Sequence, residues 1–287
     1  MSGKSGRITK GVGGICTVFA GGDYYRCVPR GLFRNTGETP LVGDLVEFSV
    51  TDEEKKEGTL HTIKPRANRL ARPPAANVDQ AIITVCEKEP ELNPGLLDRF
   101  LVLAADAGVD ALICANKSAG LSAAFEPYVA AGYGVNFTDA LSGYGMEGLR
   151  GVMAGKTSLF AGPSGVGKST LINALNPSLG LETGGLSRKT ARGRHTTRHT
   201  EIFPLGARPD DGFCFDTPGF TSLDFSHIKK DGLAPLFREF LPFIGLCRFA
   251  NCSHTKEADC AVKASVGRAV HPARYESYLK MRGCLWS

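Results

Sequence analysis

The segment 162–170 carries residue types that bind phosphate. Its glycines allow several backbone N–H groups to converge on phosphate oxygens, while a lysine ammonium reaches the β and γ phosphates and a serine hydroxyl binds Mg²⁺. An apolar run precedes the segment and a helical pattern follows it, which is the context that this Walker spacing requires. A chance glycine-rich turn is the alternative. The segment consists of Gly162, Pro163, Ser164, Gly165, Val166, Gly167, Lys168, Ser169 and Thr170.

A second motif follows the phosphate segment in the chain. Asp216, Thr217, Pro218 and Gly219 end the apolar run 212–215. Here a carboxylate can hold Mg²⁺ through water, and a glycine N–H can contact the γ-phosphate. Between the two motifs lies a polar and basic segment that includes Thr196 and Thr197. We expect one of these threonines to meet the metal and to order the segment in the triphosphate state, the alternative being a solvated charged loop.

Three cysteines and one histidine lie close together near the C-terminus. Three thiolates and an imidazole make a closed tetrahedral Zn²⁺ site, and because protein fills every position the zinc is expected to be structural. Basic residues outnumber acidic ones nearby, so we expect a small domain that presents cations to RNA phosphates. Incidental buried cysteines with a surface histidine are the alternative. The expected ligands are Cys247, Cys252, His254 and Cys260.

Three segments are expected to position these groups. Residues 1–72 contain short runs of β-formers broken by glycines, which predicts a small barrel of about five strands. Residues 73–225 alternate apolar runs with helical patterns and predict a largely parallel sheet covered by helices, one of which begins at Pro94 after the cap Asn93. Residues 226–287 form the expected zinc-binding domain. Aromatic residues in the first segment offer stacking positions for RNA or form the barrel core, namely Phe19, Tyr24, Tyr25 and Phe33.

Charge and hydropathy limit the function classes. The formal net charge is +5, and the excess of Lys and Arg lies towards the two ends of the chain, which suits them to a polyanion. No apolar run is long enough to span a bilayer, and the N-terminus lacks the apolar core of a secretory signal. We therefore expect a cytoplasmic protein that does not bind membranes.

The order of the motifs resembles a known family. Asn116, Lys117 and Ser118 resemble the base-reading motif of GTPases, yet they precede the phosphate segment. Together with the Gly-Arg-His-Thr-Thr run at 193–197, the Asp-Thr-Pro-Gly motif and the Cys/His cluster, this order resembles the circularly permuted GTPases that depend on the small ribosomal subunit. The resemblance covers essentially the whole chain. It implies a circularly permuted α/β P-loop NTPase domain, preceded by an all-β OB-fold barrel and followed by a mostly helical zinc-binding domain.

The resemblance also implies an activity. It implies Mg²⁺-dependent GTP hydrolysis that is stimulated by the small ribosomal subunit, with GTP, GDP and rRNA as ligands, one structural Zn²⁺ per chain, and a role in late subunit assembly. We expect a monomer. The apolar Phe220 cannot orient water, and the resemblance assigns this role to His195, whose imidazole titrates near neutrality. A solvent-facing or RNA-contacting histidine is the alternative.

One departure concerns the base. The family pattern is Asn-Lys-x-Asp, but Ala119 stands where the carboxylate is expected. We hypothesise that Asp139 substitutes for it, the alternative being an exposed loop aspartate. The departure keeps two rival functions open: an RNA-binding assembly factor whose nucleotide site has relaxed specificity and little turnover, and a P-loop enzyme that reads a different base.

Overall fold

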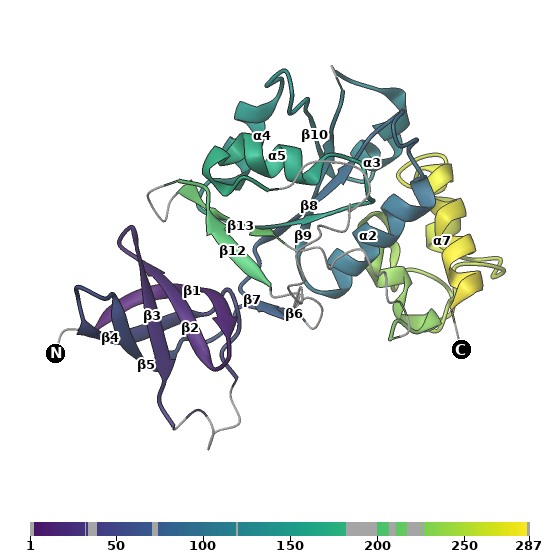
Figure 1. The fold of residues 1–287 in the computed structure, drawn as a ribbon. Helices are drawn as coiled ribbons and strands as arrows, with labels where there is room; N and C mark the ends of the chain where they lie inside the picture. Colours follow the sequence, from purple (N-terminus) through teal and green to yellow (C-terminus); the bar gives the residue numbers. More distant parts are fainter. Residues whose placement is uncertain are drawn as a thin grey trace. The chain divides into compact units, whose positions relative to one another are not determined.

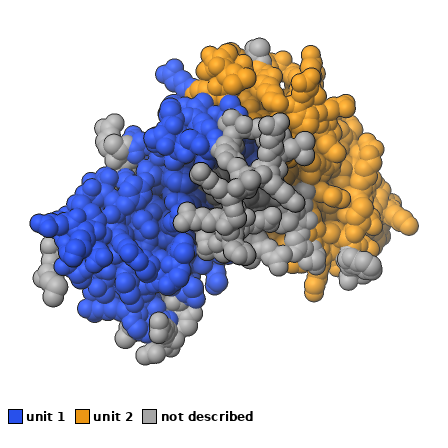
Figure 2. Space-filling view, viewed as in Figure 1, with its two compact units in different colours: residues 1–81, 147–160, 168–221 blue, residues 82–146, 161–167, 222–287 orange. Residues whose placement is uncertain are grey.

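The computed structural model describes most of the chain in two compact units. The described residues are 3–31, 33, 39–70, 74–118, 120–181, 200–206, 211–216, 225 and 227–285 (Figure 1). Unit 1 comprises residues 1–81, 147–160 and 168–221, and unit 2 comprises residues 82–146, 161–167 and 222–287 (Figure 2). Each unit therefore contains segments from distant parts of the sequence.

Unit 1 begins with a closed five-stranded barrel, drawn in purple and dark blue in Figure 1. Antiparallel pairing joins β1 to β2, β2 to β3, β5 to β4 and β4 back to β1, and a parallel pair joins β3 to β5. The ring confirms the expected barrel, and closure leaves few unpaired edges. The strands are β1 (Lys4–Val12), β2 (Ile15–Ala20), β3 (Asp23–Pro29), β4 (Leu45–Asp52) and β5 (Glu57–Ile63).

The aromatic residues of the barrel divide between its inside and its surface. Tyr25 and Phe19 are buried, and Tyr25 packs on Phe48 at 5.2 Å between ring centroids. Tyr24 is 47% exposed because successive side chains of a strand point to opposite faces. Phe19 and Tyr25 therefore belong to the barrel core, whereas stacking of RNA on the surface residue Tyr24 stays a prediction.

The rest of unit 1 continues from β1 through β12 (Glu201–Pro204) and β13 (Phe213–Asp216) to β11 (Thr157–Ala161). β12 is antiparallel to β13, and β11 is parallel to it. In the sequence, helix α4 (Met146–Met153) precedes β11 and helix α5 (Lys168–Leu175) follows it. The short 3-10 helix η2 (Pro177–Leu179) comes after α5. A small hairpin, β6 (Arg69–Leu70) with β7 (Ala75–Ala76), follows the barrel.

Unit 2 contains three neighbouring strands, β8 (Gln80–Val85), β9 (Asp110–Ala115) and β10 (Gly134–Phe137), of which β9 and β10 are parallel. Helix α2 (Pro94–Asp106) starts as expected, since the side chain of Asn93 accepts a hydrogen bond from the Leu96 N–H. A 3-10 turn, η1 (Ala123–Phe125), leads directly into helix α3 (Glu126–Ala130).

The C-terminal part of unit 2 is mostly helical, as expected. It contains three 3-10 helices, η4 (Lys230–Gly232), η5 (Ala234–Leu236) and η6 (Arg238–Phe243), and two α-helices, α6 (Ala261–Ala264) and α7 (Pro272–Cys284). Its core is aromatic and aliphatic and includes Phe237, Phe240 and Tyr278 together with Val102 of α2. The C-terminal segment and α2 therefore share one core.

A buried ion cluster joins three elements of unit 2. Arg274 of α7, which is 1% exposed, donates to Asp98 of α2 and to Glu239 of η6, the latter over 2.7 Å. Helices α2 and α7 lie side by side (Figure 1). The guanidinium also lies 4.8 Å from the ring centroid of Phe237. Two carboxylates and an aromatic face offset the cost of burying the cation.

In the described part of the chain, no helix is long and apolar enough to cross a membrane.

Candidate nucleotide site and metal centre

The phosphate segment follows β11, and at two of its positions both the backbone conformation and the available space require glycine. Gly162 has a φ of 135°, and a Cβ there would lie 2.0 Å from the carbonyl oxygen of Thr84. Gly167 has a φ of 90°, and a Cβ there would lie 2.5 Å from the Asn116 side-chain nitrogen. A side chain at either position would therefore strain the backbone and displace a neighbour.

Asn116 connects three loops of unit 2. It is buried, and its Nδ2 donates to the Val166 carbonyl over 2.8 Å. Its Oδ1 accepts from Thr138 Oγ1 and from the Ala140 N–H, both at 3.3 Å. One amide thus holds the phosphate segment and the loop after β10 against the loop after β9. The structure brings the expected base-reading motif and phosphate segment together.

Lys117 reaches the same phosphate segment. It has a positive φ of 57°, and its Nζ donates to the carbonyls of Glu89 (2.7 Å) and Gly165 (3.0 Å). Ser118 lies on the other side of the motif, where its N–H donates to the Thr138 carbonyl over 3.0 Å. Neighbouring residues of the motif therefore face different loops.

Lys168 is the first residue of α5 and directly follows Gly167 in the chain. Burial lowers the pKa of Lys168, because desolvation disfavours its charged form. A phosphate beside this amine would oppose that shift and favour the ammonium form. Ser169 and Thr170 are half-buried in the first turn of the same helix, and of the preceding loop Pro163 is half-buried and Ser164 exposed.

Of the other expected residues, the structure describes the backbone of one. Asp216 is the last residue of β13, in register with Glu201 of β12. His195, Thr196, Thr197, Gly219 and Ala119 lie outside the described residues. Their expected roles therefore stay predictions.

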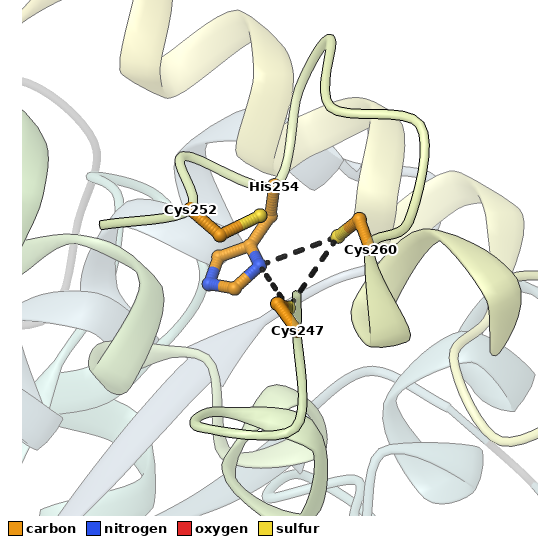
Figure 3. A group of neighbouring side chains, drawn as sticks. All are labelled: Cys247, Cys252, His254 and Cys260. Atoms are coloured by element: carbon orange, nitrogen blue, oxygen red, sulfur yellow. Dashed lines mark hydrogen bonds between the residues drawn. The ribbon is translucent and has the colours of Figure 1, made fainter. Parts of the chain in front are cut away.

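The four expected zinc ligands form one cluster in unit 2 (Figure 3). Their ligand atoms all lie within 4.8 Å of one another. The Cys247 and Cys260 sulfurs are 3.9 Å apart, and His254 Nδ1 lies 3.5 Å from the first and 3.4 Å from the second. A tetrahedral zinc with Zn–S of about 2.3 Å and Zn–N of about 2.0 Å places its ligands about 3.8 Å (S to S) and about 3.5 Å (N to S) apart. The three distances among Cys247, His254 and Cys260 fit such an ion, and the Cys252 sulfur lies within 4.8 Å of the other ligand atoms.

The electrostatics of the cluster also suit a metal. Burial lowers the pKa of His254, which favours the neutral imidazole that a metal needs. Backbone N–H groups of Ala261 and Lys263 donate to the sulfurs of Cys247 and Cys260, each at 3.4 Å. Such donors stabilise thiolate charge.

Three residues outside the ligand set, none of them predicted from the sequence, hold the ligand loop. The Glu257 carboxylate accepts from the N–H groups of Ser253 (2.8 Å) and Thr255 (3.0 Å). Tyr275 donates its hydroxyl to the His254 carbonyl (2.8 Å), and Tyr278 donates to the Ser253 carbonyl (2.7 Å). The spacing of Tyr275 and Tyr278 on one helix face could have indicated the two tyrosines, whereas no such spacing indicates Glu257.

Known proteins resemble this chain over nearly its full length. The sequence matches the RsgA GTPase family over residues 63–226 and the RsgA N-terminal domain over residues 5–60. A protein of Alkaliphilus metalliredigens named small ribosomal subunit biogenesis GTPase RsgA is 44% identical, over 98% of this chain and 97% of its own. A protein of the same name from Agathobacter rectalis is 39% identical, over 96% of this chain and 95% of its own.

Two crystal structures have the same fold. YjeQ from Thermotoga maritima is 32% identical, with a TM-score of 0.81 and coverage of 98% of both chains. YloQ, described as a circularly permuted GTPase, is 33% identical, with a TM-score of 0.80 and coverage of 98% of this chain and 94% of its own. These likenesses confirm the predicted permutation of an α/β P-loop domain. The chain belongs to the family of RsgA GTPases.

Proposed function

We propose that this GTPase binds the small ribosomal subunit and couples Mg²⁺-dependent GTP hydrolysis to its late assembly. The observation that carries the proposal is the Asn116 amide, which holds a base-reading motif against a phosphate-binding loop. The names of the relatives, small ribosomal subunit biogenesis GTPase, supply the partner.

The proposed nucleotide site assigns a role to each motif. Residues 162–170 hold the phosphates, with Lys168 on the β and γ oxygens and the Ser169 hydroxyl on Mg²⁺. When bound there, Mg²⁺ would supply positive charge to neutralise the charge that develops on the transferred phosphoryl group. Asp216 holds the metal through water, and the Gly219 N–H contacts the γ-phosphate. The remaining roles belong to Asn116, Lys117 and Ser118 at the base, Thr196 or Thr197 at the metal, and His195 at the attacking water.

The two ends of the chain are proposed to bind rRNA. On the barrel, Tyr24 is exposed and offers a stacking face. Beside the metal cluster Phe249 is 47% exposed, with the Arg248 guanidinium 5.7 Å from its ring centroid. Zinc would be structural and hold the loop that carries these two residues. We further propose a monomer in the cytoplasm, built from domains 1–72, 73–225 and 226–287.

Phosphate release from GTP, with and without purified small subunits, tests this function. We expect slow turnover alone and strong stimulation by subunits, which falls as salt rises because cation–phosphate contacts release counterions. Subunit binding without stimulated turnover would favour instead the assembly factor with little hydrolysis, an interpretation that Ala119 keeps open.

A further inference from the structure

The base-reading motif of this chain lacks the acceptor that guanine needs. The edge of guanine presents two neighbouring N–H donors, at N1 and at the 2-amino group, and a carboxylate accepts both in a bidentate manner. Alanine, which stands at position 119, accepts neither. If the protein selects guanine, as its proposed function requires, another group must supply the acceptor.

The loop after β10 lies beside the motif. Strands β9 and β10 are parallel, with Phe137 in register with Ala115, so the loops that follow them leave the same end of the sheet. The Ser118 N–H donates to the Thr138 carbonyl over 3.0 Å. The Ala140 N–H donates to Asn116 Oδ1 over 3.3 Å. These bonds fix the residues on both sides of Asp139 against the motif.

A closed turn holds the backbone of Asp139. Its N–H donates to the Tyr144 carbonyl, and its own carbonyl accepts from the Gly143 N–H, both over 2.9 Å. The turn is tight, because a Cβ at Gly145 would lie 1.9 Å from the Phe137 carbonyl oxygen. The position of Asp139 is thus set by the fold.

The carboxylate of Asp139 has the charge and the capacity for this role. Hydrogen bonds from Ser142 and from the Leu141 N–H lower the pKa of Asp139, so the group is ionised at neutral pH. Its Oδ1 accepts from the Leu141 N–H at 3.1 Å. An ionised carboxylate has about four lone-pair sites. At least one site therefore remains for a base, whose second donor would replace a Ser142 donor on the carboxylate.

Another acid in the neighbouring loops is a less suitable candidate. The Glu89 carbonyl accepts from Lys117 Nζ, which also donates to Gly165. Glu89 therefore lies on the phosphate side of the motif. Asp139 instead follows Thr138, the partner of Ser118, which directly precedes position 119.

We propose that the Asp139 carboxylate reads the guanine base in this chain, in place of the carboxylate that its Asn-Lys-x-Asp motif lacks. This inference rests on the proposed function. It assigns base selectivity to the loop after β10. The acceptor that the motif lacks at Ala119 is supplied instead by Asp139 in the adjacent loop.

The substitution Asp139→Asn tests the proposal through a change of base preference. Xanthine has a carbonyl oxygen where guanine has its 2-amino group, so an amide at residue 139 would accept from N1–H and donate to that oxygen. Asparagine also keeps the acceptor for the Leu141 N–H and is favoured in turns. We expect the affinity ratio of GTP to XTP to move towards XTP by about tenfold or more, as for exchange of a charge-assisted bond.

The measurement is competition of GTP, XTP, ITP and ATP against a fluorescent GTP analogue, on zinc-loaded full-length protein. Glu147→Gln, the same carboxylate-to-amide change on α4, should leave the ratio unchanged. The double variant Asp139→Ser with Ala119→Asp should regain the preference for GTP that Asp139→Ser loses. This rescue distinguishes base recognition from damage to the turn.

Two results would overturn the inference while leaving the proposed function intact. One is an unchanged GTP to XTP ratio in Asp139→Asn protein that binds GTP and melts like wild type. The other is a switch to XTP in Glu89→Gln, which would assign the acceptor to the loop after β8. Wild-type protein that binds no purine triphosphate would instead contradict the proposed function itself, and this inference with it.

Discussion

The side-chain amide of Asn116 donates to the main-chain carbonyl of Val166 over 2.8 Å, in a buried position. The bond joins the loop after β9 to the centre of the phosphate segment. The same side chain accepts from Thr138 Oγ1 and the Ala140 N–H, so one residue bonds to both of the other loops. We infer that base and phosphate recognition depend on one another in this protein.

Asn116→Asp should uncouple base recognition from phosphate recognition. The substitution replaces the donor facing the Val166 carbonyl with a carboxylate oxygen, and two buried acceptors then face each other. We expect GTP affinity to fall by about tenfold or more, consistent with a loss of about 1.5–3 kcal/mol. Amide hydrogen exchange of residues 164–167 should accelerate. Asn176→Asp changes a similar amide-to-carbonyl bond, to Pro204, and should leave GTP affinity unaltered.

Zinc removal should unfold the loop 247–260. The four ligand atoms lie within 4.8 Å of one another and would be held together by the metal, and structural zinc contributes about 10 kcal/mol or more to folding of small domains. We expect Cys260→Ser to lose bound zinc, as measured by plasma mass spectrometry, and to melt at a lower temperature. Cys284→Ser, at an exposed cysteine outside the cluster, is the control. Full zinc content in Cys260→Ser would refute the assigned ligand set.

Arg274→Met should destabilise the protein by about 3–5 kcal/mol, because it leaves the carboxylates of Asp98 and Glu239 buried without their cation. Chemical denaturation measures the loss. Arg248→Met removes a guanidinium whose side chain is 70% exposed and should cost little. Adding Asp98→Asn and Glu239→Gln to Arg274→Met should restore part of the stability, since no unpaired charge then remains. A stable single variant would show that the cluster contributes little to folding.

His195→Ala should affect turnover and spare binding. If the imidazole orients the attacking water, its removal should lower subunit-stimulated turnover by about 100-fold or more, the typical contribution of a general base. The affinity for GTP should stay as in wild type. Equal turnover of the two proteins would rule out a catalytic role for His195.

Local patterns predicted much of this fold. The barrel followed from alternating β-formers and glycines, and the ligand set of the metal cluster followed from four residues of suitable chemistry within a short stretch. Tyr24 and Tyr25 are instructive, because alternation requires adjacent residues to face opposite sides but does not say which side is the core.

Contacts between distant residues could not be predicted in this way. Arg274 and Asp98 are 176 positions apart, and neither residue type nor periodicity indicates that they meet. The bond from Asn116 to Val166 likewise depends on how two loops approach at the sheet edge. Such partners are determined by tertiary packing, whereas the motifs themselves are determined by local chemistry.

Calorimetric titration of zinc-loaded protein with GTP and Mg²⁺ tests the central claim most directly. We predict saturable binding of one GTP per chain, weakened about 10- to 100-fold in Lys168→Ala by loss of charge-assisted bonds to phosphate, and unchanged in Lys55→Ala, whose side chain is 73% exposed. The absence of saturable heat with any purine triphosphate, in protein shown to be folded and to contain zinc, would contradict the account.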